Sequence, residues 1–136
     1  MLANIDIINF IIIFLYRNKC MKDLSDEMVA RIAERFRGLA DATRIRILVR
    51  LQGGECNVST LANELEVAQA SISKHIAVLK GLGFILVRRE GVQAFCSIRD
   101  PALPQLCQLM CAGVTRHAQE QHAALGLSRK PRSAKT

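Results

Sequence analysis

"STLANELEVAQASISKHIAVLKGLGFILVRREGVQAFCSI" (residues 59–98) carries the pattern that decides the fold. Its first part predicts a short helix over residues 58–66, and its second part a longer helix over residues 68–84 that Gly81 or Gly83 ends. The following run over residues 84–98 predicts two strands around a turn. Two helices joined by a tight connection and followed at once by a two-stranded ribbon are the layout of a winged helix-turn-helix.

The segments on either side of this stretch predict three further helices. One follows Ser25 and ends near Gly38, a second covers residues 42–52, and the last opens at Asp100 and runs to about Leu125. Apolar residues recur along them at helical spacing. The expected fold class is therefore mainly α with a small β-hairpin.

The charge of the chain is unevenly spread. The 136 residues carry a net charge of +7, and residues 69–99 hold five positive side chains against one negative. Residues 21–68 are close to neutral, with seven positive and eight negative side chains. A basic second half favours a polyanionic partner, although a basic surface that serves solubility is the alternative.

The helix over residues 69–82 has the composition of a DNA-reading helix. Its apolar residues lie on one face, and it holds no acidic residue, whereas a solvated amphipathic helix would be richer in Glu. Short polar side chains can reach base edges in the major groove while cations meet phosphates. The predicted DNA-binding residues, on this helix and on the hairpin, are Gln69, Ser71, Ser73, Lys74, His75, Arg88, Arg89 and Gln93.

Three motifs resemble the ArsR/SmtB family of bacterial repressors. They are the "LADATR" run (residues 39–44), the "SISKH" helix (71–75) and the "RREG" wing (88–91), and the likeness covers roughly residues 26–125. The resemblance implies a cytoplasmic homodimer, built on its first and last helices, that binds a palindromic double-stranded DNA operator. It implies repression until an effector is sensed, no enzyme activity, no required cofactor and no membrane association.

Neither of the metal sites known in that family is intact here. Its arsenic- and cadmium-type members carry Cys-x-Cys on the short helix before the recognition helix. Asn57 and Ser59 stand at those positions, and Cys56 falls one position early. Zinc-type members use an Asp-x-His pair and a His-x-x-His/Glu pair on the last helix, but here Pro and Ala follow Asp100, and His117 lies too far along.

Cys107 and Cys111, with Cys96 as a third ligand, are the predicted metal-binding residues. The helical pair lies in an apolar stripe over residues 103–114, so packing as small hydrophobic side chains is the alternative. Helical neighbours four apart have Cβ atoms about 5–6 Å apart, whereas a disulfide needs about 3.8 Å. Arsenite or another soft metal ion is thus the favoured inducer. Sensing of reactive sulfur or redox state, and regulation without thiol sensing, stay open.

A small thiol redox enzyme is the alternative from another class of protein. It would need a nucleophilic Cys in a phosphate-type loop or a Cys-x-x-Cys motif at the N-terminus of a helix. The sequence contains neither. The five cysteines also fit no disulfide framework or zinc ribbon, so free thiols in a reducing cytoplasm are expected.

The two ends of the chain differ from the predicted domain, residues 21–125. Residues 5–16, "IDIINFIIIFLY", are nearly all apolar, but a membrane-spanning helix needs roughly 20 residues. Because composition changes abruptly at Met21, we interpret residues 1–20 as a mis-assigned extension, with a membrane anchor or an added dimer helix as the alternative. Residues 126–136 form a basic tail that we expect to be disordered.

Removal of residues 1–20 tests the domain assignment. We expect the shortened protein to dimerise and bind DNA like the full chain, because the family-like segment begins after Met21. Size-exclusion chromatography and gel-shift titration measure the two properties. A monomeric or insoluble product would show that the Ile-rich segment belongs to the structure.

Overall fold

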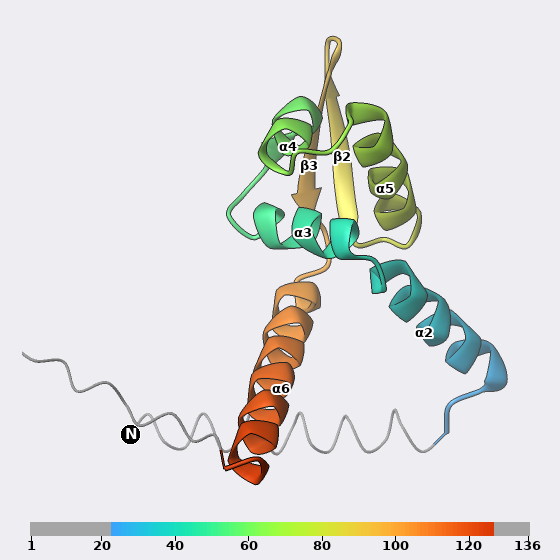
Figure 1. The fold of residues 1–136 in the computed structure, drawn as a ribbon. Coiled ribbons are helices and arrows are strands. Elements are labelled where there is room, and N and C mark those ends of the chain that lie inside the picture. Colours follow the sequence, from blue (N-terminus) through green and yellow to red (C-terminus); the bar gives the residue numbers. More distant parts are fainter. Residues whose placement is uncertain (1–22, 127–136) are drawn as a thin grey trace, which may run out of the picture. The chain divides into compact units, whose positions relative to one another are not determined.

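The computed structural model describes residues 23–126, and the predictions for residues 1–20 and for the basic tail beyond residue 126 lie outside this range. The chain divides into two compact units, Met1–Asp41 and Ala42–Thr136. The described part of the first unit contains helix α2 (Asp26–Leu39). The second unit holds all the other elements (Figure 1).

Helix α2 is amphipathic, as predicted. Its N-terminus is capped by Ser25, whose Oγ accepts a hydrogen bond from the Met28 amide at 3.2 Å. Its large apolar side chains are 36–53% exposed, so one side of the helix offers an uncovered apolar face. These side chains are Met28, Val29, Ile32 and Phe36.

The second unit contains the predicted winged helix-turn-helix. Its elements are α3 (Ala42–Leu51), β1 (Cys56–Asn57), α4 (Val58–Glu64), α5 (Gln69–Gly81), β2 (Ile85–Glu90), β3 (Gln93–Ile98) and α6 (Ala102–Ala124). Helix α4 contacts β1 and β3, α5 contacts β2, and the two helices contact each other, while α3 crosses the base of the strands (Figure 1). The two helices of the motif, the hairpin and the last helix all occur where the sequence predicts them.

The sheet has a third strand that the sequence did not predict. The strand order is β1-β3-β2, and both pairings are antiparallel. Strand β1 contains only two residues, which is too short a run to show alternation between apolar and polar side chains. It pairs with β3 so that Cys56 faces Cys96 and Asn57 faces Phe95.

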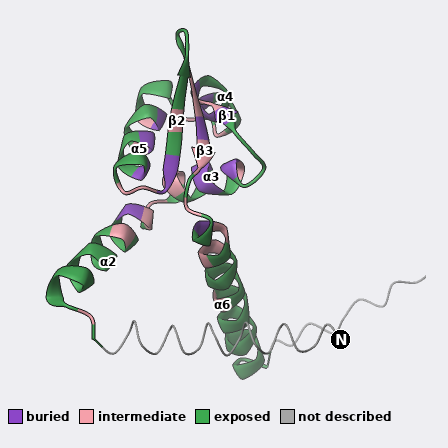
Figure 2. Cartoon of the chain, turned by 180° about the vertical axis from the view of Figure 1, so that it is seen from behind, coloured by how far each residue is buried: buried purple, intermediate pink, exposed green. Residues whose placement is uncertain are grey.

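The core of this unit is aliphatic. The residues that are almost fully buried come from α3, α4, α5, β2 and β3, and Figure 2 shows the buried positions of these elements facing one another. They are Ile47, Leu48, Leu61, Ile72, Leu79, Ile85 and Cys96. Within residues 23–126 no polar or charged side chain is buried, so apolar burial is the main source of stability.

Helix α6 contacts the rest of the unit only at its beginning. Leu103 is 2% exposed, and Pro104, Leu106 and Cys107 near it are half-buried. Leu109 and Val114 are 73% and 63% exposed, and most of the later part of α6 is exposed in Figure 2. A helix long and apolar enough to cross a membrane does not occur among the described residues.

Two local features connect these elements. Asn57 caps α4, because its Oδ1 accepts a hydrogen bond from the Ser59 amide at 2.7 Å. Gly91 turns the hairpin with a φ of 58°, a left-handed conformation that side chains with a Cβ rarely adopt. The cap links β1 directly to the first helix of the motif.

Replacing the cap of α4 should destabilise the domain measurably. Asn57→Ala removes the acceptor for the Ser59 amide and should lower the free energy of unfolding by about 1 kcal/mol. Urea unfolding followed by circular dichroism measures this change. Ser59→Ala is the matched control, because it alters a neighbouring exposed side chain and leaves the cap in place. Equal losses in the two variants would contradict the capping role.

Candidate nucleic-acid interface

Helix α5 presents the predicted reading residues as an N-terminal patch. Ile72, Ile76 and Leu79 are buried and hold one side of the helix against the domain. Gln69, Ser73 and Lys74 are exposed, while Ser71 and His75 are half-buried. Ala68 precedes the helix and has no side-chain acceptor for its first amides, so this end can approach a phosphate.

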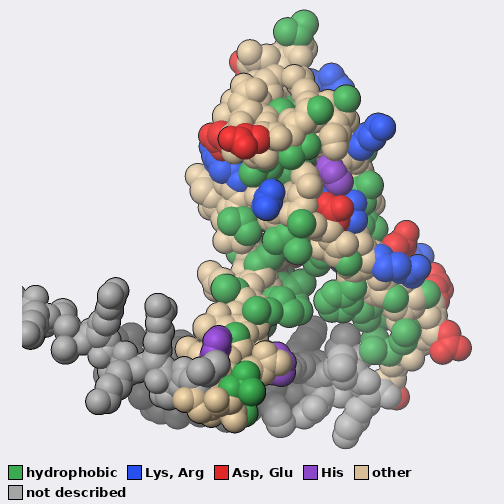
Figure 3. All heavy atoms as spheres, viewed as in Figure 1, with side chains coloured by type: hydrophobic (Ala, Val, Ile, Leu, Met, Phe, Trp, Pro, Cys, Tyr) green, Lys and Arg blue, Asp and Glu red, His purple; other side chains and the backbone are tan. Residues whose placement is uncertain are grey.

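Two of the predicted cations have no partner in the described part of the chain. Lys74 on α5 and Arg89 on β2 are exposed, and neither makes a hydrogen bond or an ion pair with residues 23–126. Figure 3 shows Lys and Arg side chains on the α5 side of this unit. A cation without a protein partner can replace counterions on a phosphate backbone without first breaking an ion pair.

Arg88 differs from these cations, because its guanidinium is already bound within the protein. One nitrogen lies 2.7 Å from Glu55 Oε1 and another lies 2.7 Å from Glu90 Oε2. The guanidinium carbon also lies 4.6 Å from the centroid of the Phe95 ring. The hydrogen bond from Arg88 lowers the pKa of the Glu55 carboxyl.

These contacts cross the whole sheet. Arg88 lies on β2, Phe95 opposite it on the central strand β3, and Glu55 immediately before β1. We call Arg88, Phe95, Glu55 and Glu90 the wing clamp. The sequence alone did not indicate it, because Glu55 lies 33 residues before Arg88 and nothing in the pattern pairs them. The DNA-binding role of Arg88 therefore stays a prediction. The alternative role for Arg88 is to hold the strands of the sheet together through the wing clamp.

The end of the hairpin is polar apart from one side chain. Gln93 is exposed beside the turn, as expected of a residue that reaches DNA, and Val92 at the tip is fully exposed. The predicted contacts of Gln69, Ser71, Ser73, His75 and Gln93 with bases or backbone stay predictions. The fold places these five residues on α5 and on the wing of the same unit.

The three predicted metal-binding thiols lie in two different environments. Cys107 is half-buried and Cys111 exposed on α6, whereas Cys96 is fully buried on β3 opposite Cys56. Burial raises the pKa of the Cys96 thiol to about 11, with smaller contributions from Cys56 and Glu55. Within the described residues no three His, Cys, Asp or Glu side chains are grouped so that they could hold a metal ion.

Comparison with known proteins identifies the family. The model for "Bacterial regulatory protein, arsR family" matches residues 41–86. The HTH-type transcriptional regulator KmtR of Mycobacterium tuberculosis is 30% identical over 120 residues, which are 88% of this chain and 88% of KmtR. The chain belongs to the arsR family.

Two further arsR-type relatives agree with this assignment. The cadmium resistance transcriptional regulatory protein CadC homolog of Staphylococcus aureus is 34% identical over 93 residues, which are 67% of this chain and 76% of the homolog. The solution structure of a homodimeric winged helix-turn-helix domain from Mycobacterium bovis superposes with a TM-score of 0.62 at 26% identity. It covers 71% of this chain and 93% of that domain.

Membership of the arsR family decides between the classes of function that the sequence left open. The relatives are DNA-binding transcriptional regulators, so the chain is a transcriptional regulator and not a small thiol enzyme. The resemblance noted from the "LADATR", "SISKH" and "RREG" motifs is confirmed.

Removing the two unpartnered cations tests the interface. Lys74→Ala with Arg89→Ala should weaken binding to duplex DNA and reduce the slope of log K against log salt by about 2, or about 1 for each lost phosphate contact. Gel shifts at several salt concentrations measure this, with a duplex selected by the wild-type protein from a randomised pool.

The matched control removes the same charge elsewhere on the domain. Lys80→Ala with Arg99→Ala removes two exposed cations, one in the last turn of α5 and one immediately after β3. This pair should leave the slope nearly unchanged. Unchanged affinity in the Lys74 and Arg89 double variant would refute the assigned interface.

Proposed function

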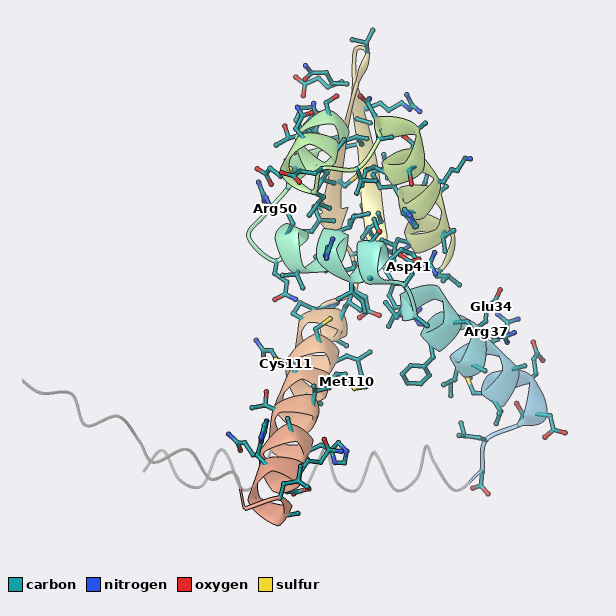
Figure 4. All side chains as sticks on the ribbon, viewed as in Figure 1. Glu34, Arg37, Asp41, Arg50, Met110 and Cys111 are labelled. Carbon is teal, nitrogen blue, oxygen red and sulfur yellow. The ribbon has the colours of Figure 1, made fainter. Side chains whose placement is uncertain are left out.

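We propose that this protein is a cytoplasmic, homodimeric repressor that leaves its operator when a thiophilic ion, with arsenite favoured, binds Cys107 and Cys111. The observation that carries the proposal is the position of this pair. The two thiols are four residues apart on α6, one half-buried and the other exposed, so an ion can reach both of them. Figure 4 shows Met110 and Cys111 projecting from this helix.

The spacing favours an ion over a disulfide. Cβ atoms at positions i and i+4 of a helix lie about 5–6 Å apart, and a disulfide between them would need about 3.8 Å. An ion that binds sulfur at about 2.3 Å bridges the pair with little change in the helix. Soft ions of this kind prefer thiolate ligands.

The exposure of the two thiols weakens the alternative of simple core packing. A cysteine that fills a core is normally buried, as Cys56 and Cys96 are. Cys111 is exposed in the single chain, and its neighbours Met110 and Val114 are 60% and 63% exposed. These side chains fit a surface between two subunits better than the core of one chain.

A homodimer is supported by features of each unit taken separately. Helix α2 exposes four large apolar side chains, and α6 exposes Leu109, Met110 and Val114, followed by the exposed Leu125 at its C-cap. The similar domain from Mycobacterium bovis is homodimeric. An ion bound on a dimer helix would shift the two reading helices relative to each other, which couples the thiols to the operator.

The third ligand stays open between two sources. Cys96, the predicted third ligand, lies in the core with Cys56 as its neighbour across the sheet, so we propose the α6 thiols of a second subunit as the other source of a third sulfur. The cadmium resistance regulator among the relatives supports a soft metal as the effector class. Sensing of reactive sulfur by the same pair is the second candidate, because Cys111 is exposed and Cys107 is only half-buried.

Single substitutions of the two thiols test the proposal. Cys107→Ser and Cys111→Ser should each bind the selected duplex nearly as the wild type does, but should no longer be released by arsenite or Cd²⁺. The reason is that a two- or three-thiolate site loses its chelate when one ligand goes. Fluorescence anisotropy of labelled duplex during ion titration measures release.

The control introduces a hydroxyl without removing a thiol. Ala112→Ser changes an exposed neighbour on α6 and should keep the wild-type response. If the thiols are packing residues, the Ser variants lose roughly 1–3 kcal/mol of stability for an unpaired hydroxyl. A wild-type dimer that ignores arsenite, Cd²⁺ and persulfide alike would refute the sensor.

A further inference from the structure

Cys56 and Cys96 form a thiol pair that the function described above does not use. They occupy directly opposite positions in the antiparallel pairing of β1 with β3. Opposite residues of such a pair point to the same face of the sheet, with Cβ atoms about 4.5–5.5 Å apart. Both side chains are buried, at 5% and 0% exposure, so both thiols lie on the core face.

We propose that Cys56 and Cys96 are a redox modification site, which a small peroxide oxidises to a disulfide that joins β1 to β3 and weakens operator binding. The proposal concerns a different pair of thiols from the effector site on α6. It rests on DNA binding by the family and not on which ion the regulator senses.

The geometry is close to that of a disulfide. Bridged cysteines have Cβ atoms about 3.8 Å apart, so the strands need to approach by about 1 Å from the ordinary spacing of opposite residues. The helical pair on α6 would have to unwind the helix to form the same bond. Of the two pairs, the one across the sheet is therefore better placed to be oxidised.

Strand β1 gives the oxidant a route to the buried thiols. It is a two-residue strand at the edge of the sheet, and it follows Gly54, whose φ of 118° permits a sharp change of chain direction. A short edge strand is held by few hydrogen bonds, so local opening costs little compared with global unfolding. A peroxide is small enough to reach the 5% exposed Cys56 during such an opening.

The reaction proceeds in two balanced steps. The thiolate of Cys56 attacks one peroxide oxygen and becomes a sulfenic acid. The other oxygen leaves as hydroxide, which takes up the proton that the Cys56 thiol lost and becomes water. The thiol of Cys96 then attacks the sulfenic sulfur, and its proton leaves with the hydroxyl as a second water. Hydrogen peroxide is thus reduced to two waters, and two thiols are oxidised to one disulfide.

The burial of the two thiols suits this order of events. Cys56 is 5% exposed and lies on the short edge strand, so it meets the oxidant first. Cys96 is fully buried on the central strand and therefore reacts second.

A bond at this position reaches the DNA-reading elements directly. Asn57, which follows Cys56, caps α4, and Glu55, which precedes it, binds Arg88 of the wing clamp. Pulling Cys56 toward β3 displaces both neighbours. The spacing between the helix-turn-helix and the wing then changes, and the two can no longer fit the operator together.

A variant with only these two thiols tests the proposal. Cys20→Ser, Cys107→Ser and Cys111→Ser together leave Cys56 and Cys96 as the only cysteines of the full chain. After hydrogen peroxide treatment we expect a cross-linked Cys56–Cys96 peptide in a tryptic digest, lost again on treatment with dithiothreitol. The Kd for the selected duplex should rise about tenfold on oxidation and recover on reduction, a change typical of switching modifications.

Two controls separate the bond from general oxidative damage. The same variant with Cys96→Ala should show no change in Kd with peroxide, and circular dichroism checks that it is folded. Cys56→Ala, at the less buried position, is the second choice and should give the same result. Full alkylation of both thiols after peroxide treatment would show that the disulfide does not form. A cross-linked peptide with an unchanged Kd would refute the effect on operator binding.

Discussion

The antiparallel pairing of β3 with both of its neighbours is the constraint on which the DNA-binding unit depends. Strand β2 pairs along the whole of β3, and β1 pairs with the remaining edge. Helices α3 and α4 pack against β3, and α5 packs against β2. A change in the register of β3 by one residue would move Cys96 and Ile98 from the core face to the outer face.

The two faces of the sheet hold the wing by different means. On the core face Ile85 and Cys96 are buried among aliphatic side chains. On the outer face the wing clamp joins β2 to the residue before β1 across the ring of Phe95. The side chains that form the two ion pairs of the clamp are 40–68% exposed. Each ion pair therefore contributes little to stability in water. Their effect is more on the position of Arg88 than on the free energy of unfolding.

The parts of the fold that were predictable from the sequence are those with long periodic patterns. Helix α5 and the hairpin were located correctly, because apolar residues recur at helical spacing in one and Glu90-Gly91 marks the turn of the other. Strand β1 could not be found, since two residues define no period. The partners of Arg88 and Cys96 were also missed, because Glu55 and Cys56 come close to them only through the pairing of β1 with β3. The grouping of Cys96 with the α6 thiols stays a prediction, and the burial of Cys96 in the core could not be read from its position just before the last helix.

Helix α6 has a consequence for how the regulator responds to its own abundance. Of its 23 residues only Leu103 is buried in the single chain, and isolated helices gain little from their own hydrogen bonds in water. If a second subunit covers the exposed part of the helix, folding of this helix and dimerisation form a single equilibrium that depends on protein concentration. Operator occupancy would then rise more steeply than in proportion to the amount of protein. Dilution, as in a growing cell that has stopped making the regulator, would lift repression abruptly.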